Sequence, residues 1–203
     1  LDGFPLLNRN YLVDDFQKAS AGCGVVGGVF VQCDCALEES LAEAQWVASL
    51  VKKGLAVQGI VAHAPVNLGA SVRSHLVELA RIPLVHGIRR LLQGEKKAGF
   101  CLQPSFIAGV QALAEFKFSF DICVRRDQLD DAIALVRACP QVSFVLDHFG
   151  NPDIKNKTME PWRAQISELS RLPNICCKLS GIVTQADDKN WTPEDLAPYV
   201  DHV

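Results

Sequence analysis

A histidine, His148, ends the strand-like run Phe144 to His148 and precedes a turn sequence, Phe149 to Pro152. Imidazole exchanges a proton near neutral pH, and burial at a strand end can tune that exchange. The position therefore favours a functional role for His148 over a purely hydrogen-bonded one. Alternation along a strand puts Asp147 on the opposite face, so we expect Asp147 to brace a helix or a loop.

A lysine and a serine share one face of the run Ile175 to Gly181, because residues two apart on a strand point the same way. The face that packs on helices should be apolar, which directs Lys178 and Ser180 inward or towards the mouth of the fold. A lysine that passes the strand end to reach water fits the same spacing. Both interpretations of Lys178 stay open.

Two arginines, Arg89 and Arg90, follow the run Leu84 to Ile88. A planar guanidinium at a strand end suits a carboxylate or a polarised oxygen of a ligand. We expect one arginine to face inward and the other to pair with a surface acid, and the sequence leaves open which is which. His63 also follows a strand-like run, where a solvated or capped loop histidine is the simpler interpretation.

The eight cysteines do not form a metal-binding pattern. No CxxC or CxxH pair occurs, and Cys33 with Cys35 supplies at most two thiolates, so packing in a reducing compartment is the better explanation. A catalytic zinc needs about three protein ligands, whereas these residues offer one plausible pocket imidazole, His148. No metal ligand and no cofactor is predicted from the residues themselves.

The polar residues described above stand at the ends of short apolar runs that alternate with stretches of helical period. After an opening helix at Tyr11 to Ala21, six strands are predicted at Val25 to Gln32, Gln58 to Ala62, Leu84 to Arg89, Phe118 to Val124, Val142 to His148 and Asn174 to Gly181. The helices that follow them are predicted at Glu38 to Lys53, Ala70 to Ala80, Pro104 to Glu115, Arg126 to Ala138, Pro161 to Arg171 and Pro193 to Val203. This alternation predicts a parallel sheet, as an open doubly wound sheet or a barrel, with its chemistry at the carboxyl edge.

Length and charge narrow the class of protein. A chain of 203 residues is expected to form a single domain over 1–203, with a core large enough to hold a pocket. Twenty basic against 23 acidic residues give no basic field, so nucleic acid is not an expected partner. Apolar runs too short to span a bilayer, and the absence of a signal-peptide pattern, predict a soluble cytoplasmic protein.

Five segments resemble a known family. They read VFVQ (29–32), GIRRLLQ (87–93), FDICVRRDQL (120–129), VLDHFGNPDI (145–154) and CKLSGIVT (177–184). In this order they resemble amidohydrolase family 2, in its sugar-lactone and dicarboxylate-lactone hydrolase branch, which is L-fuconolactonase-like. The resemblance implies a (β/α)8 TIM barrel that opens a lactone by carbonyl polarisation and water attack.

The resemblance also implies roles for individual residues. His148 would polarise the lactone carbonyl and Arg89 would bind a substrate oxygen, which makes these two the predicted catalytic residues. The predicted substrate contacts are Gln32, Lys178, Ser180 and Asp121. The expected partner is a small molecule, a sugar lactone or sugar acid.

Two family features have no counterpart in this sequence. The family's first strand carries an HxH pair and its last a GSDWP-like segment, whereas the five histidines here are never two apart. The six predicted strands would then be the second to seventh of eight, in a barrel incomplete at both ends that self-associates through open edges. A divalent metal is possible in complete members. An inactive member that binds a sugar acid or a protein partner is the alternative function, and a flavodoxin-like binding module is disfavoured because no phosphate-loop glycines follow a strand.

Overall fold

The computed structural model describes residues 8–203, in which each strand is followed by one or more helices. The strands are β1 (Gly28–Val31), β2 (Val57–Ala62), β3 (Val85–Arg89), β4 (Ser119–Ile122), β5 (Phe144–Leu146) and β6 (Ile175–Cys177). The α-helices are α1 (Val13–Ser20), α2 (Ser40–Val51), α3 (Arg73–Ala80), α4 (Pro104–Gln111), α5 (Leu113–Phe116), α6 (Leu129–Ala138), α7 (Trp162–Leu169) and α8 (Pro193–Val200). Every predicted strand is present, and all are shorter than predicted except β2, which begins one residue earlier than its predicted run.

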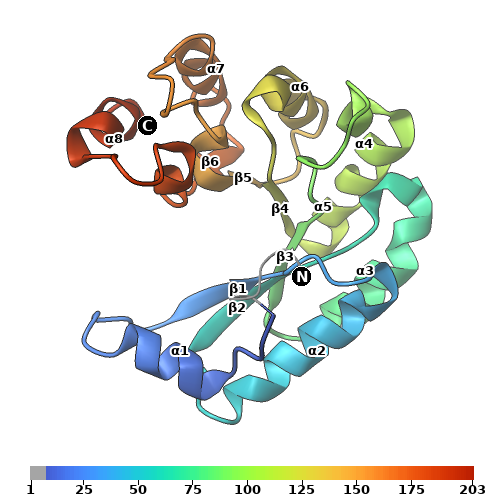
Figure 1. Ribbon diagram of the computed structural model, residues 1–203. Helices are drawn as coiled ribbons and strands as arrows, with labels where there is room; N and C mark the ends of the chain where they lie inside the picture. Colours follow the sequence, from blue (N-terminus) through green and yellow to red (C-terminus); the bar gives the residue numbers. More distant parts are fainter. Residues whose placement is uncertain (1–7) are drawn as a thin grey trace.

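The strands form one parallel six-stranded sheet in the order of the chain, β1 to β6. Figure 1 shows that the sheet curls, with the helices along its convex side. A doubly wound sheet places its first strand in the interior of the sheet, so the sequential order excludes that alternative. The fold is a half-barrel of the TIM type, as the resemblance implied.

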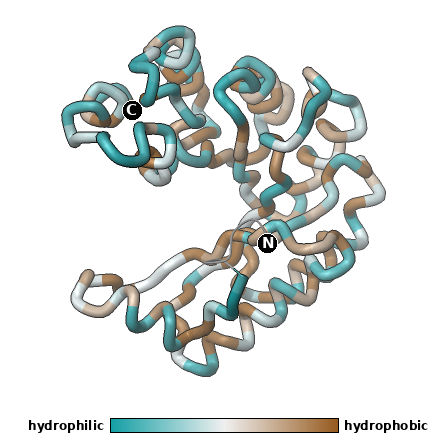
Figure 2. The backbone as a smooth tube through the Cα atoms, viewed as in Figure 1, coloured by the Kyte–Doolittle hydropathy of each residue, from teal (hydrophilic) through white to brown (hydrophobic). Residues whose placement is uncertain are grey.

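The convex side of the sheet holds the apolar core. Ile88, Phe120 and Phe144 are fully or almost fully buried there. Phe106 of α4 meets Phe120 edge to face at a centroid distance of 6.1 Å, and Phe120 meets Phe144 in the same way at 6.1 Å. Such aromatic pairs add about 0.5–1.5 kcal/mol beyond the burial of their area. Figure 2 shows the apolar residues gathered along the strands and the inner faces of the helices.

The core fixes which side chains reach the concave side. Because side chains alternate along a strand, the neighbours of Ile88 and Phe120, which are Arg89 and Asp121, point away from the helices. The register pairs Arg89 directly with Asp121 across β3 and β4. Polar groups from separate strands therefore meet on the concave side near the carboxyl edge.

The two outer strands pair on one side only within the described residues. Beside β1, an apolar groove of about 910 Å³ runs between α1, α2 and the strand, and Val29 is 60% exposed. Among the residues that the structure describes, no helix is long and apolar enough to cross a membrane.

Candidate functional site

Four charged side chains form the interior charge cluster: Arg89, Asp121, Asp147 and Lys178. Arg89 Nη1 donates to Asp147 Oδ2 at 3.0 Å, and Lys178 Nζ donates to Asp147 Oδ1 at 2.8 Å and also to Asp121 Oδ2. Both carboxylates are 1% exposed, whereas Arg89 is 14% and Lys178 31% exposed. The two cations thus offer part of their surface while the anions lie beneath them.

The position of Asp147 corrects an expectation. Strand alternation predicted that Asp147 would brace a helix or loop, yet it binds both cations on the concave side. The strand ends at Leu146, and the backbone turns left-handed at His148 (φ 53°) and Phe149 (φ 57°). Phe144 and Leu146 face the core, so Asp147 continues the concave face of the strand, and the left-handed turn brings His148 to the same side against the period of two.

Hydrogen bonds within the interior charge cluster keep Lys178 protonated. Burial alone would lower the pKa of Lys178, but hydrogen bonds from its ammonium to Asp121 and Asp147 outweigh burial and raise it. Burial raises the pKa of Asp121 in spite of the adjacent ammonium, and its Oδ1 is buried without a partner. Lys178 is therefore a fixed cation that binds anions or dipoles, because an amine with a raised pKa is a poor nucleophile.

His148 is oriented by a residue of the neighbouring β6 loop. Its Nδ1 lies 3.0 Å from Ser180 Oγ, so two of the predicted site residues are in direct contact. The half-buried ring leaves Nε2 for another partner. A hydrogen bond at one ring nitrogen fixes the tautomer and hence the role of the other.

Gln32 and the two arginines occupy distinct places. The buried Gln32 accepts a hydrogen bond at its backbone oxygen from Arg89 Nη2 at 2.5 Å, while its side-chain Nε2 has no partner. Arg90 instead pairs with Glu95 at 2.5 Å. Arg89 is thus the inward-facing arginine, and Arg90 is the one that binds an acid nearer the surface.

A polar pocket of about 440 Å³ adjoins this region over the carboxyl edge. Its lining residues come from the loops after four successive strands: Gln93, Arg125, Arg126, Asp127, Asn151 and Gln185. Gln93 Oε1 accepts from Cys123 Sγ at 3.5 Å, and Asn151 Nδ2 donates to the Val124 oxygen at 2.7 Å. The amide side chains of Gln93, Asn151 and Gln185 were not among the site residues predicted from the sequence. The one sequence signal was at Gly150 and Asn151, residue types that favour a left-handed backbone in turns.

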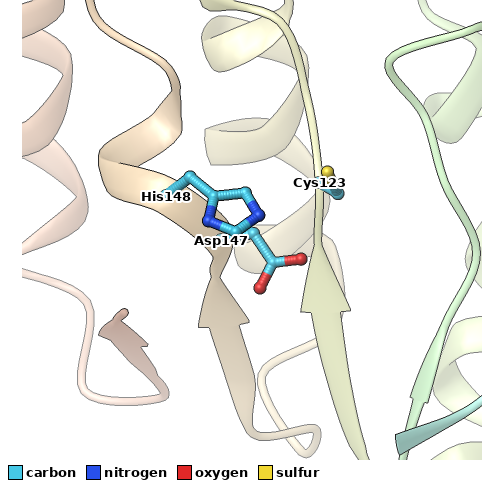
Figure 3. Close-up of side chains that lie close together, drawn as sticks. All are labelled: Cys123, Asp147 and His148. Atoms are coloured by element: carbon cyan, nitrogen blue, oxygen red, sulfur yellow. The ribbon is translucent and has the colours of Figure 1, made fainter. Parts of the chain in front are cut away.

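One group of potential metal ligands lies at the same edge. Ligand atoms of Cys123, Asp147 and His148 all lie within 4.8 Å of one another. Figure 3 shows the imidazole and the carboxylate leaving the end of β5 and Cys123 standing at the end of β4. Sequence spacing could not reveal this group because Cys123 follows β4, whereas Asp147 and His148 follow β5.

Comparison with known proteins gives the family. A protein-family model described as amidohydrolase matches residues 2–203. The chain belongs to the amidohydrolase family. This amidohydrolase is 31% identical over 178 residues to an L-fucono-1,5-lactonase of Burkholderia ambifaria, a match that covers 88% of the chain and 60% of that enzyme.

Solved structures agree with the half-barrel. An amidohydrolase of Burkholderia multivorans, crystallised with bound zinc, has a TM-score of 0.84 and 26% identity over 98% of this chain and 70% of that one. A putative 2-pyrone-4,6-dicarboxylic acid hydrolase from Pseudomonas putida has a TM-score of 0.70 and 22% identity over 98% and 71%. The latter likeness shows the fold alone.

Zinc in a relative raises the question of whether Cys123, Asp147 and His148 fit such an ion. Burial raises the pKa of the Cys123 thiol to about 11, so the thiol is protonated at neutral pH. Both Asp147 oxygens already accept hydrogen bonds from Arg89 and Lys178, whose positive charges oppose a divalent cation. These three residues do not fit a zinc ion in this arrangement.

We expect the purified amidohydrolase to retain no stoichiometric zinc through these ligands after dialysis at neutral pH. Metal binding would have to remove a proton from Cys123 and displace two ion pairs. Elemental analysis of dialysed protein checks this, with Cys123→Ser as the matched variant. One zinc per chain that disappears in Cys123→Ser would show that the ion pairs yield to the metal.

Proposed function

We propose that this amidohydrolase opens a sugar lactone by water attack on the ring carbonyl. Support comes from one arrangement above all: an imidazole held by Ser180 at the carboxyl edge, close to the Asp147 carboxylate that binds two partly exposed cations, Arg89 and Lys178. The similarity to the L-fucono-1,5-lactonase of B. ambifaria favours a sugar lactone among carbonyl substrates. The match covers only 60% of the length of that enzyme. We therefore propose lactone hydrolysis from the site of this chain and do not transfer the activity of the lactonase to it.

Lactone hydrolysis places negative charge on the carbonyl oxygen. In the proposed arrangement the Ser180 hydroxyl donates to Nδ1 of His148, and the ring proton on Nε2 donates to the carbonyl oxygen. The adjacent guanidinium of Arg89 stabilises the same developing charge. Water adds to the carbonyl carbon and loses a proton to solvent, the ring C–O bond breaks, the ring oxygen takes up a proton, and the product is a hydroxy acid.

The remaining predicted contacts have supporting roles in this proposal. Lys178 and Asp121 form an ion pair that would lie below the substrate carbonyl. The Gln32 backbone oxygen accepts a hydrogen bond from Arg89 Nη2 and so fixes the guanidinium. The amide-rich pocket beside the cluster suits a hydroxylated ligand, since amides both donate and accept hydrogen bonds. A sugar acid would bind the same surface through its carboxylate.

A pH-sensitive assay over a panel of aldonolactones tests the proposed function. We expect ring opening above the spontaneous rate for at least one lactone and no turnover of amide substrates. Binding of an aldonate without turnover of any lactone would contradict catalysis and support the alternative, an inactive sugar-acid binder. Neither turnover nor binding would overturn both.

A further inference from the structure

The polar pocket at the carboxyl edge lies beside the proposed reaction site and not around it. Its six lining residues come from the loops after β3 to β6, and none of them is His148 or a member of the interior charge cluster. Its volume of about 440 Å³ is within the range of pockets that bind whole small ligands. A lactone whose carbonyl is held at His148 therefore leaves this volume for a part of the substrate other than the carbonyl end.

The separation between the imidazole and the pocket follows from two distances that share the Cys123 sulfur. This sulfur lies within 4.8 Å of a ring nitrogen of His148 (Figure 3), and it lies 3.5 Å from Oε1 of Gln93, which lines the pocket. One sugar ring with a hydrogen bond of about 2.8 Å at each end spans at least this separation. The exposed Gln93 is thus within reach of the far side of a lactone ring held at His148, and the other five lining residues remain for a group attached to that ring.

The charges that line the pocket are paired. Arg125 Nε donates to Asp127 Oδ1 at 3.0 Å, and Arg125 Nη2 donates to Asp127 Oδ2 at 3.0 Å. Arg126 Nη1 lies 3.2 Å from Asp153 Oδ1. Each guanidinium thus has a carboxylate partner, so an anionic group in the pocket would also face that carboxylate and would gain little Coulomb energy. The part of the substrate that suits this pocket is uncharged.

The ion pairs and the amides of the pocket present hydrogen-bond donors and acceptors together. The side chains of Arg126 and Asp127 are 52% and 63% exposed, so a ligand can reach both. The Asn151 amide is fixed, because its Nδ2 donates to the Val124 oxygen at 2.7 Å. A sugar hydroxyl donates and accepts at once, which matches neighbouring carboxylate, guanidinium and amide groups. Groups that are already held in place lower the ordering penalty when a ligand binds.

We propose that this pocket binds a second sugar unit, linked by a glycosidic bond to the lactone ring, so that the substrates include lactones of disaccharides. The ligand class rests on the proposed function, because that function places the lactone carbonyl at His148. In a six-membered lactone C4 is the ring carbon opposite the carbonyl, so a sugar linked to O4 extends away from the imidazole. Such a sugar would enter the pocket at Gln93, one ring away from His148.

Two lactones that differ only in the second sugar test the proposal. Lactobiono-1,5-lactone is D-glucono-1,5-lactone with a galactosyl group on O4. We expect the unmodified chain to have an about tenfold higher kcat/KM on the disaccharide lactone, the scale of one hydrogen bond to a charged group. Arg126→Ala should bring the ratio of the two values close to one, whereas Arg137→Ala, which removes a similarly exposed and paired arginine outside the pocket, should keep the ratio. A ratio near one in the unmodified chain, or a ratio that Arg126→Ala leaves unchanged, would overturn the proposal.

A binding measurement separates this proposal from a failure of the hydrolase proposal. Lactobionate and D-gluconate are the opened forms of the two lactones, and they carry the same carboxylate. We expect titration calorimetry to give an about tenfold lower Kd for lactobionate than for D-gluconate with the unmodified chain, and similar Kd values with Arg126→Ala, even if no lactone is hydrolysed. Equal affinities in the unmodified chain, or no binding of lactobionate, would overturn the second sugar site even if D-glucono-1,5-lactone is hydrolysed.

Discussion

Asp147→Ala is expected to lower the free energy of unfolding by about 3 kcal/mol, because it removes the shared partner of two poorly solvated cations. Asp147 is 1% exposed and accepts from Arg89 and Lys178, so the variant leaves a guanidinium without its carboxylate. Lys178 keeps Asp121, which makes Arg89 the more affected residue. Urea denaturation followed by circular dichroism measures the change.

Two companion variants show whether the charge itself is responsible. Asp147→Asn keeps the size and one acceptor but removes the charge, and should recover only a small part of the loss. Asp127→Ala removes a 63% exposed carboxylate paired with Arg125 and should cost less than about 1 kcal/mol. If Asp147→Ala is no more harmful than Asp127→Ala, the interior charge cluster does not stabilise the fold.

His148→Ala is expected to lower kcat/KM on the best aldonolactone by about 10²-fold or more, the usual scale for the loss of one donor to a developing oxyanion. In the proposed arrangement the Nε2–H of the imidazole donates a hydrogen bond to the carbonyl oxygen. The methyl side chain of alanine has no hydrogen-bond donor. Initial rates at substrate concentrations well below KM measure the effect directly.

The same assay includes Ser180→Ala, in which the imidazole stays but its Nδ1 partner is lost. We expect a smaller loss than in His148→Ala together with a displaced pH profile, since Ser180 acts by setting the tautomer. His86→Ala controls for the general loss of a histidine and should keep the rate. An unchanged rate in His148→Ala would remove this residue from the mechanism.

Most of the fold follows from patterns that are local in the sequence. Each strand-helix unit has its own change of period, and residues such as Pro104 and Pro193 mark helix starts that the structure confirms. Composition does not choose between an open sheet and a barrel, because strand order depends on contacts between distant segments. The family resemblance identified the barrel, and the sequential strand order agrees with it.

The site was less predictable, for reasons that are specific to single residues. Contact between His148 and Ser180 follows from adjacent strands in a parallel sheet, which alternation and topology can suggest together. The place of Asp147 was mispredicted because alternation was counted from His148, whereas the left-handed turn at His148 and Phe149 takes that histidine out of the period that Phe144 and Leu146 set. Arg89 and Arg90 could be separated only once the register paired Arg89 with Asp121.

The sequential strand order has a consequence for how the molecule opens. Each strand hydrogen-bonds only to strands adjacent in the sequence, so β1 or β6 can separate without disturbing the pairs at the opposite end. The burial of the strands follows the same gradient: β4 is buried at three of four positions, and β6 at none. Amide hydrogen exchange should therefore be slowest in β3 and β4 and progressively faster towards both ends, as in a stack of repeats. Local opening at β6, which separates Ser180 from His148, should therefore need less free energy than the cooperative unfolding of the central strands.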